Sequence, residues 1–331
     1  MAHTPGFEDK GQGLFMLTAG EMSSLDGYLK ANIPARVFPP GELAAYSNYG
    51  TALAGYIVER ISGILFAEYV EQYIFTPLGM AHSTFRQPLP AALAVDMSGG
   101  YNYTGGAFQP GGFEFVQAYP AGSLSSTAAD MARFMIAHLQ DGRYNETSIL
   151  EADTARLMHR QHFTHDPRLL GMAHGFFEST VNGRRIISHG GDTFLFHSGL
   201  FLLPDEGTGV FVSYNSTAGA AAGAALLEVF MDRYFPAPAP AAPEPLADHR
   251  ERAQIYRGEY HLSRANFTTV EKLMALLQAV RVSVNADGEL LISLMGDIKR
   301  FVEIEPGLLR SLDSDDLVVA RSDESPPGVR S

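Results

Sequence analysis

The sequence predicts an α+β protein with two domains. Helical spacing of apolar residues dominates the first 160 positions, whereas residues 176–214 alternate like two successive β-hairpins and an Ala-rich helical stretch follows them. A Pro/Ala-rich run over residues 236–245 has the composition of a stiff, extended linker. We therefore expect a larger domain over residues 1–235 and a small β-rich domain over residues 246–331.

The first predicted helices carry clear end signals. Apolar residues recur every three or four positions between Leu53 and Ile61, and Gly63 is placed to end this helix. A shorter helix is expected over residues 21–32 and another over 65–75. Residues 88–120 are rich in Gly, Pro and aromatic side chains. They form either a wall of a binding cleft or an irregular loop anchored by its own aromatic residues.

The second half of this domain changes from helix to strand. Thr127-x-x-Asp130 is a variant of the capping box and opens a helix that Gly142 ends, and another helix is expected over residues 152–160. Strands at 176–181 and 184–188 flank the hairpin turn Asn182-Gly183. A second hairpin covers residues 196–203 and 208–214, and a helix over 218–234 closes the domain.

The C-terminal residues read as a small sheet with one helix. Thr268-x-x-Glu271 predicts a capped amphipathic helix, and alternating apolar residues predict strands near 280–284, 290–294, 302–304 and 317–320. This pattern predicts a partial barrel or lipocalin-like sheet, without a catalytic constellation, that serves packing, gating or oligomerisation. The polar, Pro-rich segment Ser322–Ser331 is expected to be disordered.

Composition excludes several classes of function. The net charge is −13 with no basic excess in either domain, so nucleic acid is not an expected partner. The chain has no cysteine, which excludes disulfides and Cys-ligated metals but does not identify a compartment. No stretch approaches the roughly 20 apolar residues of a membrane span, and no signal peptide is visible.

A tyrosine and an asparagine two residues apart stand where the helix ended by Gly63 begins. The Pro39-Pro40-Gly41 turn stops the chain before them, and Tyr46-Ser47-Asn48 follows. A phenol can relay a proton, and an amide can hold a carbonyl or an ammonium group. A buried tyrosine beside an asparagine helix cap would produce the same three residues.

The surrounding motifs resemble the serine hydrolases of the β-lactamase and penicillin-binding-protein superfamily. Besides Tyr46-Ser47-Asn48, the motifs occur in the order of that family: His3-Thr4-Pro5-Gly6, Phe75-Thr76-Pro77-Leu78-Gly79, Ala121-Gly122-Ser123-Leu124-Ser125 and His189-Gly190-Gly191. The branch most similar to this chain contains class C β-lactamases, DD-peptidases and carboxylesterases of the same fold. The resemblance implies a β-lactamase/transpeptidase-like antiparallel sheet flanked by helices, with a helical subdomain.

The resemblance also assigns roles. Tyr46 would be the general base or acid, and Asn48 would orient the substrate carbonyl. His189, Gly190 and Gly191 would line the strand beside the substrate, where the family often has Lys-Thr-Gly. The Asp192 N–H would donate to the oxyanion. No cofactor is implied, and a periplasmic or secreted location would be typical of the family.

The nucleophile of the family is not found in this sequence. The four lysines are Lys10, Lys30, Lys272 and Lys299, and none follows a serine by three positions, so no Ser-x-x-Lys exists. The family has this motif upstream of its His-Thr-x-Gly loop, so we interpret the sequence as truncated before it and inactive. The truncation would leave apolar surface exposed or covered by a homodimer contact. Ser47 is the best-placed substitute nucleophile, although adjacent residues rarely align as nucleophile and base.

Several histidines are candidates for further site residues. His159, His162 and His165 have a spacing that could bind Zn²⁺, but without a fourth ligand we interpret them as a hydrogen-bonding helix end, with no metal site. His138 is interpreted as a core-boundary residue, and His197 follows the His-Gly-Gly strand and is a candidate for the cleft. An α/β-hydrolase is excluded because no Gly-x-Ser-x-Gly elbow is present.

Two functions remain open at this point. The first is a serine hydrolase lineage acting through an acyl-enzyme on small esters, D-amino-acid peptides or β-lactams. Because a histidine replaces the lysine that would hold a substrate carboxylate, esterase or peptidase activity is favoured over strong β-lactamase activity. The second is a non-catalytic binding module that retains the cleft. The acyl group, the leaving group and the oligomeric state cannot be derived from the sequence.

Overall fold

The computed structural model describes residues 1–238 and 241–321, and it divides into two compact units. Unit 1 contains residues 1–163 and 171–237, and unit 2 contains residues 164–170 and 238–331. The predicted boundary at residue 235 therefore lies near the end of unit 1, but the short segment 164–170 groups with the C-terminal residues. Part of the predicted linker and the predicted tail Ser322–Ser331 lie outside the described residues.

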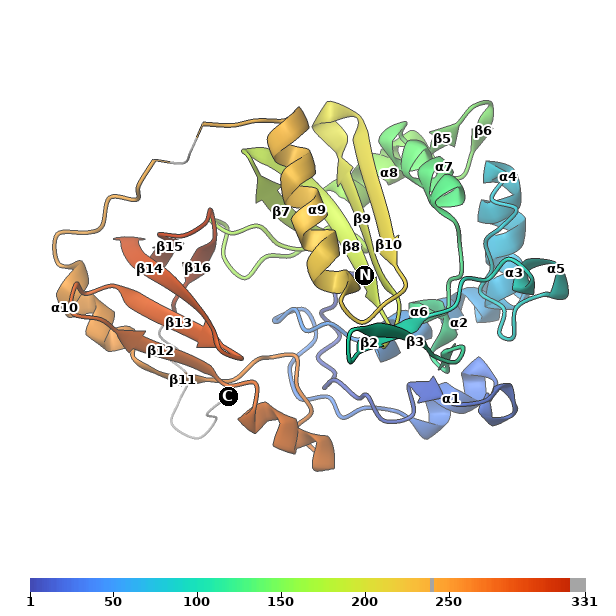
Figure 1. Ribbon diagram of the computed structural model, residues 1–331, viewed down its shortest axis with the longest axis horizontal. Coiled ribbons are helices and arrows are strands. Elements are labelled where there is room, and N and C mark those ends of the chain that lie inside the picture. Colours follow the sequence, from blue (N-terminus) through green and yellow to red (C-terminus); the bar gives the residue numbers. More distant parts are fainter. Residues whose placement is uncertain (239–240, 322–331) are drawn as a thin grey trace. The chain divides into compact units, whose positions relative to one another are not determined.

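Unit 1 contains a four-stranded antiparallel sheet with the strand order β10-β9-β8-β7. The strands are β7 (Phe177–Val181), β8 (Arg184–Asp192), β9 (His197–Leu203) and β10 (Thr208–Tyr214). The predicted turn at Asn182-Gly183 is confirmed, and both residues have positive φ, as a type I′ hairpin turn requires. Figure 1 shows α9 (Gly219–Tyr234) crossing one face of this sheet, and α7 (Ala128–Leu139) contacts β10 from the other side.

The two faces of the sheet belong to different cores because neighbouring side chains of a strand point in opposite directions. Ile186 and Leu203 pack with Met231 of α9, whereas Ile187, Leu200 and Leu202 pack in the cluster that includes Met131 and Met135 of α7. All three residues of the α9 cluster are fully buried. The sheet is thus held between helices, which is the layered arrangement predicted for the family.

The remaining helices of unit 1 come mainly from the first half of the chain. α2 (Asn48–Ser62) ends at Gly63 as predicted, with φ of 73° at that glycine. The expected helix 65–75 is present: α3 (Phe66–Val70) continues without a gap as a π-helical segment over Glu71–Phe75. The other elements are β1 (Phe15–Met16), η1 (Ala19–Glu21), α1 (Leu25–Ala31), α4 (Thr76–Leu78), α5 (Ala91–Ala94), β2 (Tyr101–Thr104), β3 (Ala107–Pro110), β4 (Phe115–Val116), α6 (Tyr119–Gly122), β5 (Arg143–Tyr144), β6 (Thr147–Ser148), α8 (Ala152–His159) and η3 (Pro204–Glu206).

Unit 2 contains a six-stranded antiparallel sheet in which each strand pairs with the next along the chain. Its strands are β11 (Gly258–Tyr260), β12 (Val280–Val284), β13 (Leu290–Leu294), β14 (Asp297–Glu305), β15 (Leu308–Ser311) and β16 (Leu317–Val319). α10 (His249–Ala253) and η4 (Gln254–Tyr256) cover one face around Leu290, Phe301 and Leu309. The predicted amphipathic helix forms as a 3₁₀ helix, η5 (Val270–Leu276), and the hydroxyl of Thr269 accepts from the Glu271 N–H.

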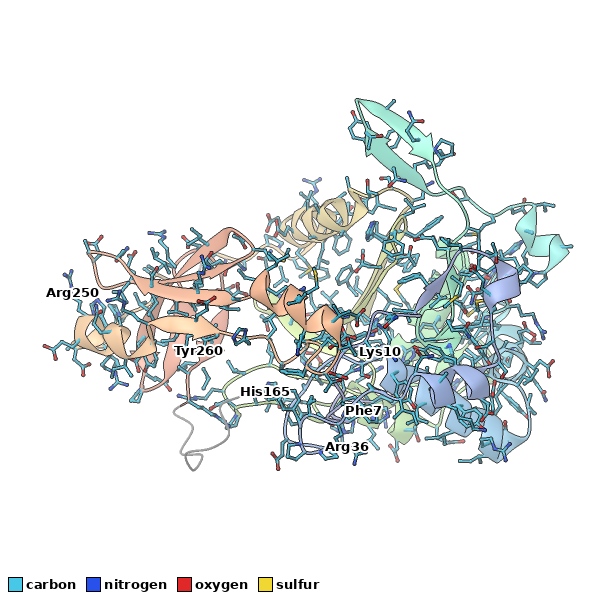
Figure 2. The ribbon with its side chains drawn as sticks, turned by 90° about the horizontal axis from the view of Figure 1, so that it is seen from below. Phe7, Lys10, Arg36, His165, Arg250 and Tyr260 are labelled. Atoms are coloured by element: carbon cyan, nitrogen blue, oxygen red, sulfur yellow. The ribbon has the colours of Figure 1, made fainter. Side chains whose placement is uncertain are left out.

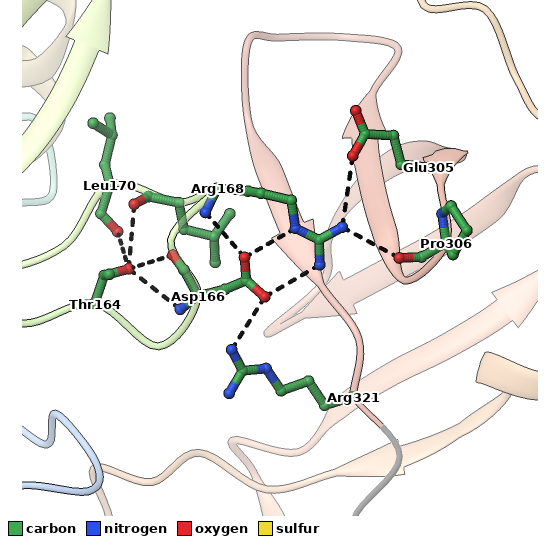
Figure 3. A network of polar contacts seen from close by, with 8 residues as sticks. Thr164, Asp166, Arg168, Leu170, Glu305, Pro306 and Arg321 are labelled. Atoms are coloured by element: carbon green, nitrogen blue, oxygen red, sulfur yellow. Dashed lines mark hydrogen bonds and ion pairs between the residues drawn. The ribbon is translucent and has the colours of Figure 1, made fainter.

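A polar network fixes segment 164–170 within unit 2 (Figure 3). The Asp166 carboxylate accepts from Arg168 Nε at 2.9 Å and from Arg321 Nη2 at 3.1 Å, while Arg168 Nη1 donates to the Pro306 carbonyl at 3.2 Å. The Arg168 guanidinium and further hydrogen bonds hold the pKa of the Asp166 carboxyl well below its usual range. These contacts explain why the segment groups with residues far from it in the sequence.

Candidate active site

The Tyr46 loop is shaped by the N-terminal residues of the chain. The Ala45 N–H donates to the His3 carbonyl at 2.8 Å, and the Gly41 N–H donates to the Thr4 carbonyl at 2.9 Å. At Gly6 the backbones approach so closely that a Cβ would lie 2.0 Å from the Phe38 carbonyl oxygen. The His-Thr-Pro-Gly motif therefore supports the Tyr46 loop, and only glycine fits its last position.

The next residues continue this support. Phe7 forms an isolated antiparallel bridge with Arg36, and the Arg36 guanidinium lies over the Phe7 ring at 5.6 Å from its centroid (Figure 2). The Phe7 ring also meets Tyr49 edge to face at 5.4 Å. Since Tyr49 belongs to the first turn of α2, the N-terminal loop contacts both the Tyr46 loop and the helix that follows it.

Four aromatic rings from four segments, including Tyr46 itself, form one cluster. The Tyr46 ring stacks on His3 with centroids 4.2 Å apart and lies 6.1 Å from His189, and Phe177 lies 6.2 Å from Tyr46 and 5.8 Å from His189. His3 comes from the N-terminal loop, Phe177 from the start of β7 and His189 from β8. The fold thus brings Tyr46 and His189 together, although 142 positions separate them in the sequence.

Ser47 and Asn48 have different positions at the start of α2. Ser47 is the N-cap residue: its hydroxyl accepts from the Gly50 N–H at 3.0 Å, and the residue is 2% exposed. Its own N–H donates to Nδ1 of His3 at 3.2 Å. Asn48 is the first residue of the helix and is half-buried. The Ser47 hydroxyl therefore serves the helix N-terminus, the usual use of serine at this position.

His189 is held as a neutral imidazole. Its Nδ1 lies 2.6 Å from the Gly190 carbonyl, and because a carbonyl only accepts, Nδ1 carries the proton that is donated. Burial lowers the pKa of His189, and the bond to Gly190 opposes this shift. In the neutral ring Nε2 then carries a lone pair, so His189 can accept a proton or a hydrogen bond but does not supply a fixed positive charge.

The end of β8 carries the other predicted strand residues. Gly190 pairs with Gly199 of β9, Gly191 with Ser198, and Asp192 with His197. His197 Nδ1 and Asp192 Oδ1 are 2.6 Å apart, so the imidazole N–H donates to the carboxylate. Nε2 of His197 is buried and has no hydrogen-bond partner within the described part of the chain. The fold thus places Asp192 and His197 directly opposite each other at the end of the hairpin.

The other candidate histidines lie elsewhere. His138 is 4% exposed on α7, with its Nδ1 3.0 Å from Nε2 of His159, and burial, followed by the nearby His159, lowers the pKa of His138 to about 4. His162 Nε2 donates to the Leu157 carbonyl at 2.9 Å. His165 belongs to unit 2. Over residues 1–238 and 241–321, no group of three or more His, Asp or Glu side chains is arranged to hold a metal ion.

A separate cavity of about 440 Å³ opens beside α8 and β7. Its lining includes Arg156, His159, Glu178 and Arg185, and two of its cations are already paired: Arg156 with Asp141 at 2.6 Å and Arg185 with Glu178. Neither Tyr46 nor His189 lines this cavity. It is therefore distinct from the aromatic cluster.

Sequence reasoning did not assign two of the residues that surround Tyr46. Phe177 was expected only as a strand residue, and nothing in its local pattern shows that its ring reaches a loop 131 positions earlier. His3 was recognised as part of a motif without a role of its own. Its signal was indirect: a His-Thr-x-Gly motif at a fixed order before Tyr46.

The fold and the site together define a class of protein. A tyrosine at a helix start faces a histidine on a strand of an antiparallel sheet, and a terminal helix covers that sheet. This is a serine hydrolase scaffold of the β-lactamase and penicillin-binding-protein type. The family model described as Beta-lactamase matches residues 1–231, and the chain belongs to this family.

Curated relatives match shorter parts of the chain. Penicillin-binding protein 4 of Amycolatopsis lactamdurans is 32% identical over 127 residues, which cover 37% of this chain and 33% of the relative. A putative D-alanyl-D-alanine carboxypeptidase of Escherichia coli K12 is 27% identical over 177 residues, which cover 47% of this chain and 41% of the relative. The matches thus span less than half the length of these relatives.

Solved structures share the fold at low sequence identity. The octameric penicillin-binding protein homologue from Pyrococcus abyssi has a TM-score of 0.54 and 20% identity, covering 97% of this chain and 75% of the homologue. A class C β-lactamase from Rhodobacter sphaeroides has a TM-score of 0.53 and 19% identity, with 70% of each chain covered. No helix in the described ranges is both long and apolar enough to cross a membrane.

Proposed function

We propose that Tyr46, Asn48 and His189 form one side of an acyl-transfer pocket for small esters, D-amino-acid peptides or β-lactams. Tyr46 relays the proton, Asn48 orients the substrate carbonyl, and the Asp192 N–H donates to the developing oxyanion. The observation that carries the proposal is the 6.1 Å separation of the Tyr46 and His189 rings within one aromatic cluster. Membership of the β-lactamase family supports the reaction class.

The substrate preference follows from His189. A lysine at this position would hold a substrate carboxylate with a full positive charge, whereas burial lowers the pKa of His189 and favours the neutral ring at pH 7. We therefore infer that uncharged esters or peptide groups fit this pocket better than ligands that depend on carboxylate recognition. The curated relatives named above as a penicillin-binding protein and a putative D-alanyl-D-alanine carboxypeptidase support a pocket for β-lactam or peptide acyl groups. Penicillins and D-alanine termini carry the carboxylate that we expect this pocket to bind less well.

A second function, ligand binding without turnover, is favoured by the absence of the family's Ser-x-x-Lys motif from these 331 residues. No Ser-x-x-Lys is present, and the Ser47 hydroxyl already accepts the Gly50 N–H at the start of α2. Attack on a substrate from Ser47 would require this cap to break in a residue that is 2% exposed. We therefore propose that the chain as given binds acyl ligands and hydrolyses them at or near the background rate.

Activity assays test the catalytic part of this proposal. Nitrocefin and p-nitrophenyl butyrate are incubated with the purified chain and with Ser47→Ala, and we expect no turnover above buffer in either case. Turnover in the wild-type chain that is lost in Ser47→Ala would show that Ser47 is the nucleophile. Turnover that survives in Ser47→Ala would show that another group acts, and would contradict the proposed inactivity.

Binding assays test the pocket itself. N-acetyl-D-alanyl-D-alanine methyl ester, which has no free carboxylate, should raise the melting temperature of the wild-type chain more than benzylpenicillin does, because a ligand that binds only the native state stabilises it according to its affinity. Tyr46→Phe and His189→Ala should weaken this effect. Tyr73→Phe is the matched control, since Tyr73 is 45% exposed and its ring contacts Tyr69 outside the cluster. Equal binding by all variants would exclude the proposed pocket.

We also propose that the chain self-associates. α9 exposes Leu226, Val229 and Tyr234, with 66% of Val229 accessible, although the opposite face of the helix is packed on the sheet. A structural relative that aligns with 97% of the chain is described as octameric. Sedimentation velocity should show an oligomer that Val229→Glu dissociates. A wild-type monomer at all concentrations would contradict this proposal.

A further inference from the structure

The turn between β8 and β9 is held by a side chain from a distant segment. Both oxygens of the Glu114 carboxylate accept hydrogen bonds from this turn: the Thr193 hydroxyl donates at 2.6 Å, the Phe194 N–H at 2.7 Å and the Leu195 N–H at 3.2 Å. Glu114 lies in the long Gly- and aromatic-rich segment that the sequence offered as a cleft wall. Its carboxylate thus satisfies three donors of a turn that begins one residue after Asp192.

Apolar packing reinforces this contact. Leu195 is 5% exposed, and a Cβ at Gly111 would lie 2.3 Å from its Cδ1 atom, while a Cβ at Gly100 would lie 2.7 Å from its Cβ. The Phe194 ring lies 4.7 Å from Phe15. The turn is therefore seated on residues 100–114 by both packing and hydrogen bonds, and the two glycines allow the approach.

The strand ends on the other side of the turn are fixed as well. His197 Nδ1 donates to the Asp192 carboxylate at 2.6 Å, and the Thr193 N–H donates to the Phe196 carbonyl at 2.9 Å. Asp192 is thus the last strand residue before a turn whose geometry is set from outside the hairpin. The Asp192 N–H lies in the peptide plane shared with Gly191, and the Asp192 Cα joins that plane to the peptide of Thr193. A displacement of the turn therefore shifts the Asp192 backbone and its N–H.

We propose that Glu114 is a positioning residue for the pocket: it fixes the turn 193–196 and thereby the Asp192 N–H that faces the substrate carbonyl. This inference rests on the proposed function, in which that N–H donates to the oxyanion. Small misplacements of such a donor weaken its interaction strongly, since the geometry must match the transition state. Glu114 acts through the backbone and does not touch the substrate.

Glu114→Gln removes the negative charge and one acceptor oxygen of the side chain and keeps the shape of the side chain. A glutamine keeps the size of the side chain but has one acceptor oxygen, and its NH₂ group would face a donor of the turn. At least one of the three hydrogen bonds is then lost. Glu21→Gln is the matched control, because the Glu21 carboxylate accepts from the Leu17 and Thr18 N–H groups in another turn.

Amide exchange measured by NMR on the full chain tests, without any ligand, whether Glu114 holds the turn 193–196. In Glu114→Gln we expect the Phe194 and Leu195 amides to exchange about tenfold faster and the Asp192 amide resonance to move, with the exchange of Ile187 and Leu202 unchanged. In Glu21→Gln these signals should stay as in the wild type. Unchanged amide exchange at residues 193–195 in Glu114→Gln would overturn the proposal that Glu114 fixes this turn.

Ligand affinity tests the positioning role. With N-acetyl-D-alanyl-D-alanine methyl ester as the probe, Glu114→Gln should bind about fivefold or more weakly than Glu21→Gln, for equal losses in melting temperature. A loosened turn with an unmoved Asp192 resonance and unchanged affinity would make Glu114 merely structural and overturn the proposal. If the wild-type chain binds no probe, the proposed function fails, and the exchange rates and the Asp192 resonance decide on Glu114 alone.

Discussion

The two large sheets of the molecule have cores of different chemistry. In the sheet of unit 1, the neighbouring residues Ile186 and Ile187 are both fully buried and point into two apolar clusters on opposite faces. In the sheet of unit 2, Phe301 and Glu303 point to the same face, and the glutamate is 2% exposed. One sheet is thus buried by apolar contacts on both faces, and the other contains a carboxylate in its packed face.

Both oxygens of the buried carboxylate of unit 2 accept hydrogen bonds. Glu303 accepts from Arg252 Nε at 2.7 Å, from the Tyr256 hydroxyl at 2.7 Å and from the Gly307 N–H at 2.7 Å. Burial alone would raise the pKa of Glu303, but these donors outweigh it and lower the pKa below its usual value. A small sheet covered by one short helix has few apolar side chains to bury, so a satisfied polar network organises part of its core.

The largest effect is expected in the apolar sheet. Ile187→Ala should lower the free energy of unfolding by about 3–4 kcal/mol, because it removes buried methylene groups and leaves a cavity between β8 and α7. Urea unfolding followed by circular dichroism measures this loss. Ile187→Val, which removes a single methylene, should cost about 1 kcal/mol. Equal losses for both variants would show that the site does not form a tight apolar contact.

Removing the carboxylate of the second sheet should have a similar but smaller effect. Glu303→Ala leaves Arg252, Tyr256 and the Gly307 N–H without their acceptor, and should destabilise unit 2 by about 3 kcal/mol. Amide exchange of β14 reports this loss. Asp313→Asn is the control, since it breaks an exposed pair with Arg300 and should have far less effect. A small loss of stability in Glu303→Ala would mean that apolar contacts alone support this sheet.

Acid should destabilise the two units over different pH ranges. His138 has a pKa of about 4 in the fold against about 6.5 when unfolded, so its contribution is present above pH 6.5 and is lost as the pH falls toward 4. Unit 1 should lose about 2–3 kcal/mol over this range. The pKa of Glu303 is lowered, so its stabilisation persists above the ordinary carboxyl pKa and is lost only at lower pH.

Unfolding curves between pH 7 and 4 test this difference. Amide exchange resolved by unit should show unit 1 weakening from pH 6.5 downward more than unit 2, in which burial lowers the pKa of one histidine, His165. His138→Gln should reduce the pH dependence of unit 1 without removing it, because burial lowers the pKa of His159 and His189 as well. If both units weaken together in this range, the buried His138 is not the cause.

The sequence allowed much of the regular structure to be predicted. The hairpin around Asn182-Gly183, the end of α2 at Gly63 and the start of α7 at Thr127 all follow from local signals, and the structure confirms them. These signals depend on the conformation or hydrogen bonding of one or two residues. They do not require knowledge of distant contacts.

What remained unpredicted depends on contacts across the chain. Segment 164–170 was expected with the first domain, but Asp166 and Arg168 bond to Arg321 and Pro306, and no local pattern reveals those partners. Glu114 lies in the Gly- and aromatic-rich stretch 88–120, and no local pattern predicts its contact with the turn 193–196. In the sequence, Tyr46 and His189 were linked only by a family resemblance. Their roles in the site stay predictions that the binding assays test.

The hairpin turns of the two sheets include the smallest expected effect, which is that of Gly183→Ala. Gly183 and Gly288 both have positive φ, 71° and 82°, so alanine at either position costs about 1 kcal/mol in backbone strain. No atom lies within 4 Å of a Cβ at Gly183, whereas a Cβ at Gly288 would lie 2.4 Å from Arg250 Cγ on α10. Gly183→Ala should therefore cost about 1 kcal/mol, and Gly288→Ala about 1–2 kcal/mol more. Urea unfolding of both variants measures the difference, which reports how tightly α10 packs on its sheet. Equal losses of unfolding free energy in the two variants would mean that the Arg250 side chain moves aside and that backbone strain alone sets the loss.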